Sequence, residues 1–139
     1  MQQPQNAEQS IKKRPAIFTQ VSQVKPSKCG YNLKLKVLYL NNVLEKTRID
    51  GTTVRIAECI VGDESGSIIL TARNDQIDKV QPGKSIIVRN SKIDMFKGFM
   101  RLAVDKWGKI ENSPEAFHFQ VNANNNLSHI EYELVSVEE

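Results

Sequence analysis

The stretch "GDESGSIILTARNDQIDKVQPG", residues 62–83, decides the fold. A polar turn with two glycines opens it, and residues 67–73 then alternate between two faces with the period of two that is typical of a β-strand. Asn74 is a candidate helix cap and Pro82-Gly83 a candidate stop, so residues 74–81 predict one or two helical turns. We therefore expect a strand, a short helix and the approach to another strand.

Four more strand patterns flank this stretch. Residues 31–43 form a run that is long for a strand, so we expect it to bend and to serve both ends of a barrel. Residues 45–52 form a charged loop that ends in an Asp-Gly turn signal, and residues 53–61 form the second strand. After the short helix, residues 84–95 and 99–110 form the fourth and fifth strands, joined by a Lys-Gly turn.

Five strands with one short helix between the third and the fourth predict an all-β, five-stranded Greek-key barrel of the oligonucleotide/oligosaccharide-binding (OB) type. A closed barrel leaves no free sheet edges, which suits a chain of this length. A five-stranded SH3-like barrel is the alternative, but the helix between strands three and four argues against it. The 139 residues have room for one domain, which we place at residues 16–137 with the barrel core over residues 31–111.

The two ends of the chain differ from the barrel. Residues 1–15 are rich in glutamine and lack a helical or strand period, so we interpret them as a disordered basic arm. Residues 127–137 carry apolar side chains at every second position from Ile130 to Leu134, which predicts a C-terminal strand. We expect this strand to pack on the barrel or to pair with residues 18–24. A disordered acidic tail that screens the barrel is the alternative.

Charge is divided unevenly along the chain. Residues 1–111 hold all 19 lysines and arginines and 11 of the 16 acidic residues, whereas residues 112–139 hold five glutamates and no basic residue. A basic body suits a polyanionic partner. Cys29 and Cys59 match no metal-binding spacing, and no apolar run approaches the roughly 20 residues that span a bilayer. Without a signal-peptide pattern, we expect a soluble intracellular protein with reduced thiols.

Three short motifs carry a family resemblance. They are the D-x-[ST]-G-S-I turn at residues 63–68, the Gln-Pro-Gly at residues 81–83 and the Phe-Lys-Gly turn at residues 96–98. Over residues 21–111 the chain resembles the single-domain OB-fold proteins related to the OB-fold component of the sensor of single-stranded DNA complex. It is more similar still to the plant-type single-domain OB-fold proteins. The resemblance implies nucleic-acid binding without catalysis.

The aromatic positions of that family are mostly changed here. The sensor proteins stack bases on aromatic side chains of strands three, four and five. By the resemblance, these positions fall on Arg73, Lys92 and Ala103 in this chain, and only Phe96 keeps an aromatic ring. The resemblance therefore implies a platform with fewer rings and more positive charge.

Strand parity predicts which side chains form this platform. Arg73 points outward from the third strand, and Phe99 and Arg101 point outward from the fifth while Met100 and Leu102 enter the core. Each base stacked on an aromatic ring contributes about 1–3 kcal/mol, and an arginine can stack on a base and contact phosphate. The candidate nucleic-acid-binding face is both basic and aromatic, and consists of Arg55, Arg73, Lys92, Phe96, Lys97, Phe99 and Arg101.

Three of the exposed-looking residues also have purely structural interpretations. Phe96 can cap the end of the barrel. Arg73 can pair with Asp75 or Asp105 instead of a ligand. Trp107 can pack under the C-terminal segment.

Two functions of different classes fit these observations. The first is binding of single-stranded nucleic acid, DNA in preference to RNA, through the basic and aromatic face. The second is an accessory subunit that docks a larger DNA- or RNA-processing complex and has little nucleic-acid affinity of its own, and we expect a protein partner of this kind.

Other features bound the remaining expectations. The chain has no Gly-rich phosphate loop, nucleophile elbow or CxxC pair, so we expect neither enzyme activity nor a metal or other cofactor. The basic cluster Lys12-Lys13-Arg14 favours nuclear localisation, with the cytoplasm as the alternative.

Overall fold

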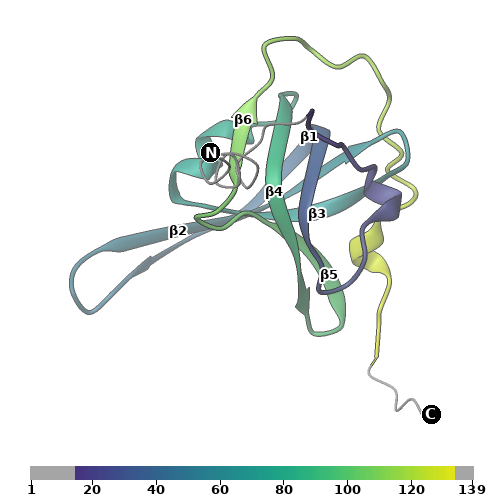
Figure 1. The fold of residues 1–139 in the computed structure, drawn as a ribbon. Helices are drawn as coiled ribbons and strands as arrows, with labels where there is room; N and C mark the ends of the chain where they lie inside the picture. The colour runs from purple at the N-terminus through teal and green to yellow at the C-terminus, as the bar shows by residue number, and fades with distance from the viewer. Residues whose placement is uncertain (1–14, 134–139) are drawn as a thin grey trace, which may run out of the picture.

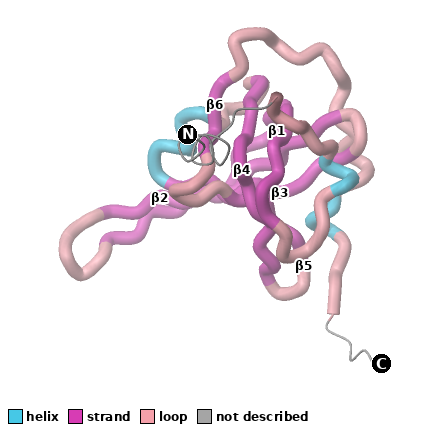
Figure 2. Tube along the Cα trace, in the orientation of Figure 1, coloured by secondary structure: helices cyan, strands magenta, loops and turns pink. Residues whose placement is uncertain are grey.

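The computed structural model describes residues 15–133, which form an all-β barrel with three short 3-10 helices (Figures 1 and 2). None of the helices in this range is long and apolar enough to cross a membrane. In chain order the elements are η1 (Val21–Gln23), β1 (Cys29–Thr47), β2 (Thr53–Asp63), β3 (Gly66–Arg73), η2 (Asn74–Lys79), β4 (Ser85–Phe96), β5 (Phe99–Ala103), β6 (Lys109–Asn112) and η3 (Leu127–His129).

The expected five-stranded barrel of the OB type is confirmed. Its strands follow the order β1-β2-β3-β5-β4, and pairing of β4 with β1 closes the sheet. The long β1 pairs with β4 through its first half and with β2 through its second half, as expected of a bent strand that serves both ends. The β3–β5 seam is parallel and consists of only two residue pairs, Leu70 with Leu102 and Thr71 with Ala103.

The fifth strand is interrupted, which differs from the single strand expected over residues 99–110. β5 ends at Ala103, and β6 resumes the pairing with β4 at Lys109. Between them Asp105 accepts hydrogen bonds from the backbone N–H groups of Trp107 (2.9 Å, through Oδ1) and Gly108 (3.1 Å, through the carbonyl). Asp at the first and Gly at the fourth position is a turn signature, and this turn lifts residues 104–108 out of the sheet.

The first hairpin is longer than expected. β1 continues to Thr47, so the connection shrinks from residues 45–52 to residues 48–52. The turn is held by a hydrogen bond from Arg48 N to Thr52 O (2.7 Å), and the carboxylate of Asp50 accepts from the backbone N–H and hydroxyl of Thr52. The hairpin projects well beyond the barrel at the left of Figure 1.

A short helix follows the third strand as expected, but its cap is different. Arg73, with extended backbone, is the N-cap residue of η2, and its N–H donates to the side chain of Gln76. Asn74 instead adopts a left-handed conformation (φ 52°), and its Oδ1 accepts from Arg55 N at 3.0 Å. Asn tolerates this conformation better than most residues, so it fastens β2 to the end of β3.

The core lies inside the barrel and follows the parity predicted from sequence. Ile68, Leu70 and Ala72 of β3 and Met100 and Leu102 of β5 are buried. Ala103, which the resemblance placed on the outer face, is buried as well. The outer residues of β3 remain available to a surface site.

The D-x-[ST]-G-S-I turn fixes the barrel to both flanking segments. Asp63 is buried, and its carboxylate accepts from Val21 N of η1 at 3.0 Å and from the backbone and hydroxyl of Ser65. A Cβ atom at Gly66 would lie 2.8 Å from the carbonyl oxygen of Asn125, so glycine permits the C-terminal segment to approach. This family motif therefore has a structural role: it holds both flanking segments on the barrel.

The C-terminal segment packs on the barrel, but not in the way its alternation predicted. Its first three residues form η3, and isolated bridges join Asn126 to Ser67 and Glu131 to Phe99 in place of regular pairing. Leu127 and Ser128 are buried, whereas Ile130 and Tyr132 remain 46% and 39% exposed. No pairing with residues 18–24 occurs in the described part of the chain. Residues 134–137 of the expected strand and residues 1–14 of the expected arm lie outside the described residues.

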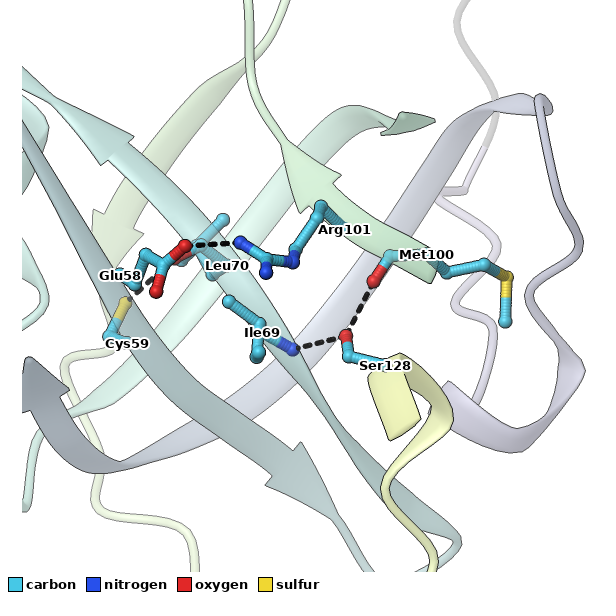
Figure 3. Close-up of polar contacts among 7 residues, drawn as sticks. All are labelled: Glu58, Cys59, Ile69, Leu70, Met100, Arg101 and Ser128. Carbon is cyan, nitrogen blue, oxygen red and sulfur yellow. Dashed lines mark hydrogen bonds and ion pairs between the residues drawn. The ribbon is translucent and has the colours of Figure 1, made fainter. Parts of the chain in front are cut away.

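Ser128 inserts a hydroxyl group into the short seam between β3 and β5. Its Oγ accepts from Ile69 N (2.9 Å) and donates to Met100 O (2.5 Å), as Figure 3 shows. Ile69 and Met100 lie just beyond the two paired positions of the seam. The C-terminal segment thus supplies hydrogen bonds where the two strands do not pair with each other.

Candidate functional site

A hollow of about 460 Å³ opens on the outer face of the barrel. β2, β3, β4 and β5 all contribute to it, because neighbouring strands bring outward residues into register: Ile56 pairs with Arg73, and Asp94 pairs with Arg101. Its lining combines two arginines and two carboxylates with apolar and hydroxyl groups, namely Arg73, Arg101, Glu58, Asp94, Ile56, Met95, Phe96 and Thr71.

Arg101 occupies the centre of this face. Its guanidinium forms an ion pair with Glu58 of β2 (Figure 3) and lies 5.0 Å from the centroid of the Phe96 ring. The Arg101 side chain is only 18% exposed, and Glu58 and the Phe96 ring both contact it. A guanidinium fixed in this way can present its plane to a ligand without losing much conformational entropy on binding.

Phe96 is available for contact with a ligand. It ends β4 beside a turn in which both central residues, Lys97 (φ 52°) and Gly98 (φ 91°), have positive φ, as a type I′ hairpin requires. The ring is 51% exposed, so Phe96 does not cap the barrel interior. The ammonium of Lys97 lies 5.4 Å from the ring centroid, which places positive charge beside the stacking surface.

Arg73 stands at the other rim of the hollow. It is exposed, and it forms no salt bridge with Asp75, Asp105 or any other carboxylate among residues 15–133. The purely structural interpretation, in which Arg73 pairs with Asp75 or Asp105, is therefore wrong. Its guanidinium is placed to meet an anionic group.

The other three residues of the predicted face lie at its margins. Arg55 forms an ion pair with Glu45 (3.8 Å), and Lys92 forms one with Asp94 (3.6 Å). Phe99 is partly covered, since the C-terminal segment bridges to it through Glu131. The hollow thus brings Arg73, Phe96 and Arg101 together, whereas Arg55, Lys92, Lys97 and Phe99 lie outside its lining, Lys97 beside the Phe96 ring.

Two acidic residues of the site were missed by sequence reasoning. Glu58 and Asp94 balance the charges of Arg101 and Arg73 within the lining, so the hollow is less basic than the predicted face. Parity could have found both: Glu58 alternates with the buried Ala57 and Cys59 of β2, and Asp94 follows the buried Ile93. Their strand partners depend on register, which the sequence alone did not provide.

The sequence comparison identifies the family. A model of the family described as single-stranded DNA binding protein Ssb-like, OB fold, matches residues 24–112. The chain belongs to this family. The resemblance noted from the three motifs is thereby confirmed. An uncharacterized protein of Arabidopsis thaliana is 48% identical over 137 residues, which cover 92% of this chain and 89% of that relative.

Solved structures share the fold of this chain. The solution structure of a hypothetical protein from Arabidopsis thaliana is 47% identical, with a TM-score of 0.74 over 91% of this chain and 93% of that one. The second OB-fold domain of replication protein A from Methanococcus maripaludis is 19% identical (TM-score 0.56; 73% of this chain, 100% of that one). A replication protein A heterotrimer bound to single-stranded DNA is 16% identical (TM-score 0.59; 76% and 26%). At these lower identities the likeness is one of fold.

Proposed function

We propose that this protein binds single-stranded nucleic acid, DNA in preference to RNA, through the hollow between Arg73 and Phe96, and does so without catalysis. The observation that carries the proposal is the exposed Phe96 ring, which has two cations within 5.4 Å of its centroid. Membership of the Ssb-like family supports the same ligand class.

The geometry supports one stacked base and a small number of phosphate contacts. A base can stack on the exposed part of the Phe96 ring, while Lys97 and Arg73 meet phosphates next to it. Since Glu58 and Asp94 offset charge within the hollow, we expect about two released cations and a log–log salt slope of about −1.4. Stacking on one ring contributes about 1–3 kcal/mol, so micromolar rather than nanomolar affinity is expected.

The accessory-subunit alternative has one specific observation in its favour. The projecting β1–β2 hairpin exposes large apolar side chains, namely Tyr39, Val43, Leu44 and Ile49. Exposed apolar groups on a projecting element are typical of protein contacts. We propose docking to a larger nucleic-acid-processing complex as the second function, with this hairpin as its contact.

Fluorescence anisotropy with a labelled single strand at two salt concentrations tests the first function. Phe96→Ala and Arg73→Gln should each weaken binding, by about 1–3 kcal/mol for the ring, and Arg73→Gln should flatten the salt slope by about 0.7. Lys84→Gln is the matched control, because it removes the same charge from an exposed site at the far end of β4. Wild-type binding by both hollow variants would exclude the hollow as the binding site.

We also propose a nuclear location, on the basis of the Lys12-Lys13-Arg14 cluster. Imaging of the tagged chain with and without Lys12→Ala, Lys13→Ala and Arg14→Ala tests this. Equal nuclear signal for both forms would remove the cluster as its cause.

A further inference from the structure

Trp107, the one tryptophan of the sequence, is 72% exposed on the turn between β5 and β6. The turn is well fixed: besides the two hydrogen bonds to Asp105, the side chain of Asn90 donates to Trp107 O at 2.9 Å. Packing of Trp107 under the C-terminal segment, its structural interpretation from sequence, is therefore wrong. A large apolar ring is held in solvent on an ordered turn.

A second ring, that of Phe18, contacts the residue of β4 next to Asn90. The Phe18 ring has Lys34 Nζ at 4.6 Å and the guanidinium carbon of Arg89 at 5.7 Å from its centroid. Arg89 directly precedes Asn90, so adjacent residues of one strand contact the Phe18 ring and the Trp107 backbone. Lys106 Nζ lies 5.1 Å from the Trp107 centroid, which gives each ring at least one cation. We call Phe18, Lys34, Arg89, Lys106 and Trp107 the Trp107 surface.

The charge of this surface favours an anionic partner. Four carboxylates lie near its three basic residues. The buried Asp63, which accepts from Val21 N, and the exposed Glu64 line a pocket together with Phe18 and Lys34. Glu111 accepts from Arg89 at 2.8 Å and pairs with Lys109 at 3.1 Å, and Asp105 is used by the turn. Lys34 and Lys106 form no salt bridges among the described residues. An aromatic ring next to an unpaired cation matches what one nucleotide offers, a base next to a phosphate.

β4 connects the Trp107 surface to the hollow. Asn90 and Phe96 lie on this single strand, six residues apart, and at about 3.3 Å per residue the two sites are about 20 Å apart. The outward residue between them nearest to Asn90 is Lys92. A single strand that occupies the hollow can therefore continue along β4 and reach Trp107 if it is several nucleotides longer.

We propose that the Trp107 surface is a second contact for single-stranded nucleic acid, used only by strands too long for the hollow alone. The inference rests on the proposed function and specifies how far a bound strand extends from the hollow along β4. It predicts that affinity increases with strand length through one identified ring. The experiment also distinguishes this contact from binding of a protein partner to the same surface.

The emission of the single tryptophan reports on this contact directly. Oligothymidines of about five and about 15 nucleotides bracket the short and long ends of known OB-fold site sizes. The long strand should quench Trp107 emission, whereas the short strand should bind and leave the emission unchanged. Affinity alone does not decide, because a longer strand also offers the hollow more registers. Anisotropy of labelled strands gives the affinity in parallel.

Variants separate this inference from the proposed function. Trp107→Ala should weaken binding of the long strand about tenfold and leave the short strand unaffected, while Trp107→Phe keeps a ring and should retain most of the affinity. Phe96→Ala should weaken both strands. Because Trp107 is exposed, these variants should fold like the wild type, which a thermal melt checks.

Three outcomes would count against a second contact at the Trp107 surface. If neither strand binds, the proposed function fails, and this inference with it. If both strands bind, the emission stays constant and Trp107→Ala binds the long strand like the wild type, the hollow is the whole site and only this inference fails. If the emission is quenched but Trp107→Ala binds the long strand like the wild type, the ring is near the ligand without contributing, and the surface is left for a protein partner.

Discussion

Arg101 is ion-paired with Glu58 across the outer face of the barrel, although β3 lies between their two strands. The pair has two opposite effects on the candidate site. It fixes the guanidinium beside Phe96, which lowers the entropic cost of binding, and it offsets the positive charge that would attract a phosphate. Substitution of the carboxylate measures which effect is larger.

Glu58→Gln should increase affinity for single-stranded DNA several-fold and steepen the log–log salt slope by about 0.7, because one more cation becomes available to phosphate. The amide retains a hydrogen-bonding group, so stability should fall by only about 1 kcal/mol. Anisotropy titrations and thermal melts check both quantities. Glu115→Gln makes the same charge change at an exposed site away from the hollow. Weaker binding by Glu58→Gln would show that the fixed geometry matters more than the charge.

Ser128→Ala should destabilise the barrel by about 1–3 kcal/mol, since it leaves Ile69 N–H and Met100 C=O without their partner in the seam. Urea unfolding measures the change. His129→Ala, at the exposed neighbouring position, should stay within about 0.5 kcal/mol of the wild type. Equal effects of the two substitutions would mean that the hydroxyl group does not hold the seam.

Deletion of residues 126–139 should lower the melting temperature more than Ser128→Ala does, because the buried Leu127 side chain is lost together with the hydroxyl group. Differential scanning calorimetry of the two proteins gives the comparison. Unchanged melting combined with tighter nucleic-acid binding would instead support the screening tail.

Gly98→Ala should be more destabilising than Gly83→Ala. Both glycines have positive φ, 91° and 87°, where an L-residue costs about 1–2 kcal/mol. Only at Gly98 would the new Cβ meet backbone, at 2.7 Å from Tyr132 O, and nothing lies within 4 Å at Gly83. Gly83→Ala therefore measures the conformational cost alone, and the difference measures the contact with the C-terminal segment. Equal losses by chemical unfolding would argue against that contact.

Cys59 should resist alkylation in the folded protein while Cys29 reacts. Burial, with a smaller effect of the charge on Glu58, raises the pKa of Cys59 to about 12, whereas Cys29 is exposed. The unfolded thiol ionises near pH 8.5. The contribution of the Cys59 thiol to the free energy of unfolding is therefore fully present below about pH 8.5 and decreases as the pH rises toward 12. Mass spectrometry after iodoacetamide at pH 8 should show one modified cysteine natively and two in denaturant, and Cys29→Ser should show none natively.

The elements that sequence reasoning placed correctly are those whose signal is local. The alternation of residues 67–73 predicted both the strand and the outward direction of Arg73, and the Lys97-Gly98 pair predicted the hairpin turn. The features that it missed depend on partners distant in sequence. Asn74 is not the helix cap, because its side chain accepts a hydrogen bond from Arg55 N. The C-terminal segment forms η3 in place of a strand, because the Ser128 hydroxyl group lies between β3 and β5. The exposure of Trp107 depends on where Asn90 lies, which no local pattern encodes.

The two-pair seam between β3 and β5 also has a consequence for the order of events during synthesis. β3 is complete at residue 73, but its neighbour β5 begins 26 residues later, and the hydroxyl group that supplements their contact is at residue 128. A nascent chain that has emerged only through β3 has a three-stranded meander with an open edge. The seam is complete only after Ser128 has left the ribosome, so until then exposed backbone groups of β3 are available to chaperones or to aggregation with other nascent chains.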